Sequence, residues 1–553
     1  MRKFFPLFLL IVFTTLQTGA QSRKELRARA KANATIEQNL RTHIGFLASD
    51  DLEGRRTGTP GEAKAAAFLA DYYTRLGIQP VSGHSHQLPF EVNEGVFPAS
   101  GTHYEINDIQ LEPVTDLIPL PWSHLGTAIQ GSAFVNVHEA NTPWWFDIAP
   151  VLEENKTNPH FMADQVLRDK AKEVAAKGAK ALLVYNSGNM EDGIRYSSKD
   201  NTETVHIPVY FLTSAGLKKS RLLEESSAYS NLTTTLAPKI KTGLNVAAYL
   251  DNGAPYTVIL GAHYDHLGYG EDGNSRHAGE PSIHNGADDN ASGTAVLMEL
   301  ARLLSQHKKS VPVNVLFLHF SGEELGLYGS KYYTSNPLLP FAQVSYMINM
   351  DMVGRLNAEK TLTIGGVGTS PAWGNLIPQN TKYGLTYKVD SSGSGPSDHT
   401  SFYRMDLPVL FFFTGLHTDY HKPGDDANLI NYKGATDITN TIYDVVMKTP
   451  RNEKLVFTKT AERSMGTGTF RVSIGIMPDY TFSGTGIKAD GVIDNRPAKK
   501  AGVETGDIIV QLGEHLITSM ETYMQALNRF NKGESTTVTV KRGDKILEFP
   551  ITF

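Results

Sequence analysis

The sequence predicts an α/β protein whose main domain has a mainly parallel sheet with helices on both faces. Between residues 245 and 447, short apolar runs that end in polar residues alternate with amphipathic helical segments. This alternation is typical of parallel strands joined by crossover helices. The 553 residues suffice for three or four domains, and 40% hydrophobic residues are ordinary globular usage.

The composition excludes several kinds of protein. The chain has no cysteine, which rules out disulfides, thiolate metal sites and a cysteine nucleophile. The formal net charge is -6 and no basic tract interrupts the acidic balance, so we expect no nucleic acid partner. A disordered chain is excluded because there is enough apolar material for large cores.

Residues 1–20 are predicted to be a signal peptide. Arg2 and Lys3 precede an apolar segment over residues 4–13, and small residues end the pattern at Ala20. An uncleaved anchor is the alternative, but this apolar run is shorter than the ~20 residues of a membrane span. No later segment approaches such a span. We therefore expect an exported protein, periplasmic or secreted, with no stable membrane span after signal cleavage.

Two helices are predicted before the first strand. Thr35 is a suitable N-cap for a helix over residues 36–47. Pro60 opens a second helix, which covers residues 63–76 and ends at Gly77. These helices belong to the main domain, which we place at residues 21–110 and 245–447.

Residues 111–244 change in character and are predicted to form a β-rich insert. Short strands accompany one amphipathic helix. The alternative is that the segment is simply more of the main domain. The predicted strands cover residues 133–137, 181–185 and 207–212, and the helix covers residues 166–177.

The main domain then alternates strand and helix up to residue 447. In such sheets, ligands bind at the carboxyl ends of the strands. Residues 448–464 are charged and aperiodic and are predicted to be a linker, and residues 465–553 form a further domain of short strands with a helix over 521–530. The main-domain strands cover 256–260, 313–320, 344–349 and 409–413, and its helices cover 293–304, 325–333 and 435–447.

Five polar motifs lie at the predicted carboxyl ends of these strands. Each has an ordinary explanation, such as helix capping by an Asp or a solvated helix start for the Glu pair. Together they supply two His, two Asp and one Glu, with a spare Glu, which suffices for two cations if one carboxylate bridges them. Nitrogen and oxygen donors without sulfur favour zinc, with cobalt or manganese as alternatives. The motifs are residues 261–265, 284–293, 321–324, 349–354 and 420–426.

In these motifs the chain resembles the di-zinc aminopeptidase family, whose relatives include glutamate carboxypeptidase, the transferrin receptor and glutaminyl cyclase. The resemblance covers residues 40–447 and includes the run from Phe46 to Arg55. It implies two zinc ions, with Asp289 as the bridging ligand. Asp289 is preferred to Asp288 because the family's bridging Asp precedes a Ser-Gly pair by three residues. The implied ligands are His263, Asp289, Glu324, Asp351 and His421.

The resemblance also implies three catalytic residues. Glu323 matches the general base, and Asp265 matches the carboxylate that supports His263. Tyr420 is the candidate donor to the oxyanion, because the run over residues 395–399 lacks the tyrosine that some members place there.

Two other segments resemble known modules. The insert at 111–244 is similar to a protease-associated domain in residues 171–185 and 207–210, and would either cover the cleft or act as a spacer. Residues 465–553 resemble a PDZ domain, with a carboxylate-binding loop at 473–476 and a bacterial signature at 497–507. A PDZ groove would accept a peptide C-terminus as an added strand. The alternative is a domain that only packs against the peptidase.

These observations predict an exported zinc-dependent exopeptidase, an aminopeptidase, that acts on peptide substrates. Carboxypeptidase or dipeptidase action is one alternative. A non-catalytic binding protein like the transferrin receptor is another, but neither the predicted ligands nor Glu323 are lost.

Overall fold

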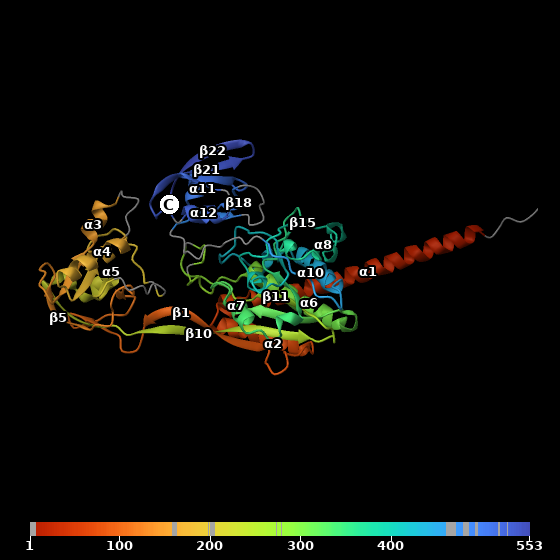
Figure 1. Cartoon of the computed structure of the whole chain (residues 1–553), viewed down its shortest axis with the longest axis horizontal. Coiled ribbons are helices and arrows are strands. Elements are labelled where there is room, and N and C mark those ends of the chain that lie inside the picture. Colours follow the sequence, from red (N-terminus) through yellow and green to blue (C-terminus); the bar gives the residue numbers. More distant parts are fainter. Residues whose placement is uncertain are drawn as a thin grey trace, which may run out of the picture.

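The computed structural model describes residues 7–156, 163–196, 198, 205–272, 274–277, 279–460, 472–478, 486–492, 496–517, 520–527 and 529–553. Residues 1–6 of the predicted signal peptide and residues 461–471 lie outside this set. Figure 1 shows a large α/β domain, an insert at the end of a long two-stranded ribbon, and a C-terminal domain.

The large domain is built on an eight-stranded sheet in the order β1-β10-β12-β11-β13-β16-β14-β15. The four central strands, β12, β11, β13 and β16, run parallel, while β10 and β14 join them in antiparallel pairs. The predicted α/β class is thus confirmed, with antiparallel pairs toward both edges. The strands are β1 (Gln87–Pro98), β10 (Leu236–Leu250), β11 (Thr257–His263), β12 (Asn314–Phe320), β13 (Val344–Met350), β14 (Thr361–Gly365), β15 (Thr386–Val389) and β16 (Val409–Phe413).

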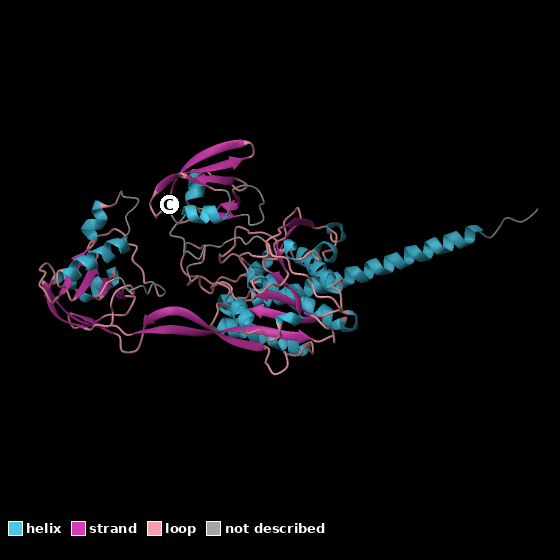
Figure 2. Ribbon diagram, viewed as in Figure 1, coloured by secondary structure: helices cyan, strands magenta, loops and turns pink. Residues whose placement is uncertain are grey.

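Helices cover both faces of this sheet (Figure 2). In β11, Val258 and Leu260 point to the core that α1, α2, α6 and α10 share, whereas Ile259 points to the core of α7 and α9. This two-residue alternation of apolar side chains explains why the central strands are apolar throughout. The helices are α1 (Leu7–Leu47), α2 (Pro60–Arg75), α6 (Gly293–Gln306), α7 (Tyr328–Ser335), α9 (His399–Tyr403) and α10 (Tyr432–Met447).

Helix α1 is much longer than the predicted helix over residues 36–47. Thr35 does not cap it; its hydroxyl donates to the carbonyl of Lys31, one turn earlier. The segment between residues 21 and 35 is rich in Ala, Arg and Lys, which favour helix and do not end one. In Figure 1, α1 projects from the domain. No helix in the described part of the chain combines the length and apolar character needed to cross a membrane.

The insert stands on a ribbon formed by β1 and β10. These strands pair antiparallel from Gln87 with Val246 to Pro98 with Leu236, and residues 99–235 follow at the far end of the ribbon (Figure 1). The insert holds two four-stranded sheets, and its likeness to a protease-associated domain stays a prediction. Its elements are β2 (His103–Ile106), β3 (Ile109–Gln110), β4 (Leu117–Pro119), β5 (Ile129–Phe134), β6 (Pro143–Asp147), α3 (Ala149–Glu154), α4 (Ala163–Ala176), β7 (Ala181–Tyr185), β8 (Val209–Leu212), α5 (Ser214–Ser220) and β9 (Ser227–Thr233).

After α10 the chain continues to pack against the large domain up to Thr460. Leu455 is buried in the main core, and the N–H of Thr458 donates to the carbonyl of Thr369 at 2.8 Å. Tyr403 receives the N–H of Thr460 at 3.0 Å. Residues 455–460, which fall in the predicted linker, therefore pack against the large domain.

The C-terminal domain has its own apolar core and a mainly antiparallel sheet in the order β17-β18-β19-β21-β22. Strand β20 pairs with β19 off this path. The elements are β17 (Ile476–Pro478), β18 (Ile487–Val492), α11 (Pro497–Ala501), β19 (Ile508–Leu512), β20 (His515–Leu516), α12 (Met520–Leu527), β21 (Ser535–Arg542) and β22 (Lys545–Thr552).

Candidate metal centre

The four central parallel strands end at one edge of the sheet, and the predicted site residues gather there. Strand β11 ends at His263, and β13 ends at Met350, one residue before Asp351. Glu323 and Glu324 follow β12, and His421 comes from the loop after β16. Strand direction alone thus brings together residues that are far apart in the sequence.

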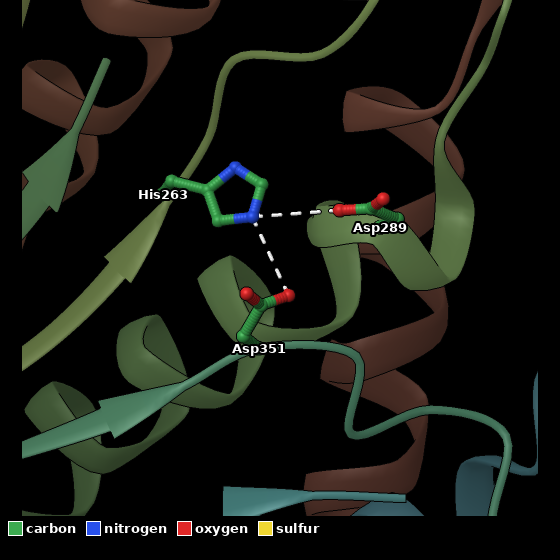
Figure 3. A group of neighbouring side chains, drawn as sticks. All are labelled: His263, Asp289 and Asp351. Carbon is green, nitrogen blue, oxygen red and sulfur yellow. Dashed lines mark ion pairs between the residues drawn. The ribbon is translucent and has the colours of Figure 1, made fainter. Parts of the chain in front are cut away.

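One group of ligand atoms forms around His263 (Figure 3). Its Nε2 lies 3.4 Å from Oδ1 of Asp289 and 3.4 Å from Oδ1 of Asp351. The ligand atoms of these three residues all lie within 4.8 Å of one another. His263 is buried, with an exposure of 1%, so this nitrogen is directed at the two carboxylates rather than at solvent.

A second group forms around the other oxygen of Asp289. His421 Nε2 lies 3.3 Å from Oδ2 of Asp289 and 3.2 Å from Oε2 of Glu324. Burial raises the pKa of Glu324, but His421 and the nearby His266 outweigh that effect and lower it to about 2. Asp289 therefore offers one oxygen to each group, which is the arrangement that a bridging ligand requires.

In the loop before α6, two adjacent aspartates have different contacts and different roles. Oδ1 of Asp288 accepts the N–H of Gly354 at 2.6 Å, and its Oδ2 lies 3.3 Å from Nε2 of His417. Asp425 accepts the backbone N–H groups of Asp288 and Asp289 at 2.9 and 3.0 Å and so fixes the loop. Asp288 is thus committed to the scaffold, while Asp289 faces the two histidines.

Glu323 lines the pocket beside the two groups without belonging to either. Burial raises the pKa of its carboxyl well above the ordinary value, and the neighbouring carboxylate of Asp351 adds to this effect. The backbone N–H of Glu323 donates to Oδ1 of Asp265 at 3.3 Å. The same Oδ1 lies 3.6 Å from Nδ1 of His263, and this nitrogen is 3.2 Å from the backbone carbonyl oxygen of Asp265, so Asp265 supports both residues.

A pocket opens beside the two groups, and Tyr420 forms part of its lining. The Tyr420 ring stacks on His421 with centroids 3.9 Å apart, and the guanidinium of Arg276 lies 4.5 Å from its centroid. Burial and the nearby carboxylate of Asp289 raise the pKa of Tyr420, so the phenol keeps its proton. The apolar lining comes from Met352, Pro396, Phe411, Phe413, Leu416 and Pro478.

Sequence reasoning missed two residues of this site. His266 Nδ1 lies 2.8 Å from Oε1 of Glu324, and the ligand atoms of His266, Asp289 and Glu324 also lie within 4.8 Å of one another. Its place three residues after His263 was the available signal. Arg276 lies in a polar loop with no strand or motif to mark it.

The residues present fit divalent cations. Four buried or half-buried carboxylates, those of Asp289, Glu323, Glu324 and Asp351, face two histidines in one pocket. Buried carboxylates at this density repel one another unless cations compensate them. The His-to-carboxylate distances of 3.2–3.4 Å are also long for hydrogen bonds and suit atoms placed around a shared ion.

Arg55 holds together the backbone segments that carry the site. It is fully buried, and its guanidinium donates to the carbonyls of Tyr264 at 2.8 Å, Asn285 at 2.7 Å and Gly286 at 3.1 Å. It also donates to the carbonyl of Leu47. One side chain therefore ties the end of α1 to the end of β11 and to the loop that carries Asp289.

We expect Arg55→Met to destabilise the protein by about 3 kcal/mol or more, because it leaves several buried carbonyls without donors. The melting temperature from thermal unfolding should fall by several degrees. Arg75→Met is the matched control, since Arg75 is exposed and only pairs with Asp71 on the helix surface. Equal melting temperatures for the two variants would contradict a structural role for Arg55.

Two family models match the chain. Residues 245–446 match peptidase family M28, and residues 472–553 match the PDZ domain. Aminopeptidase YwaD of Bacillus subtilis (strain 168) is 27% identical over 459 residues, which are 78% of this chain and 88% of that protein. An aminopeptidase of Pseudomonas aeruginosa (strain UCBPP-PA14) is 32% identical over 195 residues, 34% of this chain and 32% of that protein.

Solved structures are similar at low identity. The aminopeptidase from Aneurinibacillus sp. strain AM-1 has a TM-score of 0.43 and 21% identity, covering 77% of this chain and 96% of that one. A zinc aminopeptidase from Bacillus subtilis has a TM-score of 0.43 and 20% identity, covering 76% of this chain and 98% of that one.

Proposed function

Residues 245–446 belong to peptidase family M28 and residues 472–553 are a PDZ domain, and from that membership we propose that the chain is an exported, zinc-dependent aminopeptidase. The observation that carries the proposal is the position of Asp289, with one oxygen toward each of two histidine-carboxylate groups. The relatives in Bacillus subtilis and Pseudomonas aeruginosa are named aminopeptidases, which supports the same activity.

Two zinc ions would be held by His263 and Asp351 on one side and by Glu324 and His421 on the other, with Asp289 between them. His421 is preferred to His266 because its Nε2 faces carboxylates of both Asp289 and Glu324. Zinc at this site supplies a Lewis acid and lowers the pKa of water.

The chain's own residues carry the proton transfers. Glu323 takes a proton from the attacking water and delivers it to the leaving amine nitrogen. Asp265 holds the backbone of Glu323 and supports the ring of His263. Tyr420, whose phenol stays protonated, donates a hydrogen bond to the carbonyl oxygen as that oxygen gains negative charge.

The pocket favours a free N-terminus. Beyond the five predicted ligands, its lining includes the carboxylates of Glu323 and Asp390, which attract a substrate ammonium group. The apolar wall that contains Met352 and Phe411 suits an apolar first side chain. Arg276 also lines the pocket, and its presence there favours the alternative of carboxypeptidase or dipeptidase action.

The proposal is tested with leucine p-nitroanilide, its N-acetylated form, and an N-blocked dipeptide with a free C-terminus. We expect turnover of the first substrate alone, loss of it with a chelator, and recovery on addition of zinc. Turnover of the N-blocked dipeptide would establish carboxypeptidase action. No turnover of any substrate by the zinc-loaded protein would favour a non-catalytic binding protein.

Export is tested by the N-terminus of the protein recovered from its source cells. If the signal peptide is cleaved after Ala20, the periplasmic or secreted protein should begin at Gln21. Mass spectrometry of the intact chain measures this directly. An N-terminus at Met1 in the purified protein would contradict cleavage.

A further inference from the structure

We propose that the PDZ domain holds the C-terminus of the same short peptide whose N-terminus lies in the catalytic pocket, so that the two sites together select peptides by length. The proposal rests on the proposed aminopeptidase function. It starts from one residue, Pro478, which ends β17 of the PDZ domain and also lines the catalytic pocket.

Strand β17 can accept another strand. It is the terminal strand of its sheet and pairs with β18 on one side, with no partner on the other among the described strands. A terminal strand offers its outer row of N–H and C=O groups to an added chain. This is how an extended peptide joins an exposed sheet edge.

The loop before β17 fixes the direction of such a peptide. This loop contains Gly475, whose φ of +82° is in the left-handed region that glycine adopts without strain, so the chain turns sharply here into β17. A terminal carboxylate held at the loop leaves the rest of the peptide to run along β17 from Ile476 toward Pro478. The peptide is then antiparallel to β17, and its N-terminal part is directed to the pocket.

Charge at the loop is complementary to a carboxylate. Arg496 is exposed, and its Cβ lies 2.1 Å from the point where a side chain on Gly475 would begin, so the two residues are in direct contact. The N–H of Gly475 donates to the hydroxyl of Ser473 at 3.1 Å. Ser473 is exposed, so a bound carboxylate can displace its hydroxyl, and the contact between Gly475 and the base of the Arg496 side chain keeps that long cationic side chain within reach of the loop.

The catalytic pocket and the strand β17 adjoin at Pro478, and together they set the favoured length of the peptide. One residue at the loop, about three along β17 and one on each side of the cleaved bond give on the order of six residues. A shorter peptide reaches only one site. A longer peptide must bulge between the sites, which costs conformational freedom and removes strand contacts.

The test compares peptides with an N-terminal leucine, from about two to about twelve residues long, each as a free acid and as a C-terminal amide. With the full-length protein we expect kcat/KM for the acids to peak near six residues. There it should exceed the value for the amides by about tenfold, the scale of one charge-assisted contact. Leucine p-nitroanilide reports the peptidase site independently of the PDZ domain.

A pair of variants locates the effect. Arg496→Gln should reduce the preference for acid over amide by several-fold at the favoured length. Lys545→Gln is the matched control, since Lys545 begins β22, the terminal strand at the other end of the same sheet. It should leave the preference unchanged.

Equal rates for acids and amides at every length would overturn the proposal, even if leucine p-nitroanilide is cleaved and the aminopeptidase function stands. A preference that rises with length and never falls would also overturn it, because it would mean that the two sites do not limit the length. If the wild-type protein does not cleave leucine p-nitroanilide at all, the proposed aminopeptidase function is itself refuted.

Discussion

Replacing Glu323 with glutamine is expected to lower kcat by at least about 100-fold while both zinc ions stay bound. The amide keeps the size and position of the side chain but cannot accept a proton from water. Glu323 lines the pocket outside the two groups of ligand atoms, so zinc binding should survive the change. Kinetics with leucine p-nitroanilide and elemental analysis of the same sample measure both effects.

Asp390→Asn serves as the control for Glu323→Gln. Asp390 also lines the pocket, so the control removes a pocket carboxylate of the same charge. It should change KM for substrates with a free N-terminus more than kcat, because it acts on binding rather than on proton transfer. Wild-type kcat in zinc-loaded Glu323→Gln would refute the assignment of the general base.

Asp289→Asn should lose at least one zinc ion and, with it, activity. The substitution removes the one carboxylate whose two oxygens face both histidines, at 3.4 and 3.3 Å. The amide offers only one good metal-binding oxygen, and the negative charge between two cations is gone. Zinc content per chain, measured by elemental analysis after gel filtration, gives the result.

Asp288→Asn is the matched control in the adjacent position. Asp288 holds the N–H of Gly354 and faces His417, so this change should reduce stability more than zinc content. If Asp289→Asn kept two zinc ions and Asp288→Asn lost zinc, Asp288 would be the bridging ligand and Asp289 the structural residue.

The central part of the fold was predictable because its signals are local. A largely buried parallel strand such as β16 appears as a continuous apolar run, and its bounds at 409–413 match the prediction. Polar residues directly after such strands meet at one edge of the sheet. That is why residues as distant as His263 and Asp351 could be grouped from the sequence, whereas the structure adds that they are 3.4 Å apart.

Other elements lacked such signals. Strands β14 and β15 lie toward the edge of the sheet, and neither shows a continuous apolar run. Thr alternates with apolar residues in β14, and β15 is partly exposed. The role of His266 depends on a side-chain contact with Glu324, 58 positions away in the sequence. The packing of Leu455 on the large domain depends on tertiary contacts that a charged, aperiodic segment does not reveal.

The ribbon of β1 and β10 has a consequence for how this protein can change in evolution. The strand that leaves the large domain and the strand that returns are hydrogen-bonded neighbours, and Pro98 pairs with Leu236 at their far end. The insert also carries apolar cores built from its own residues. A gene segment for residues 99–235 can thus be gained, lost or exchanged in evolution at the cost of one tight hairpin turn.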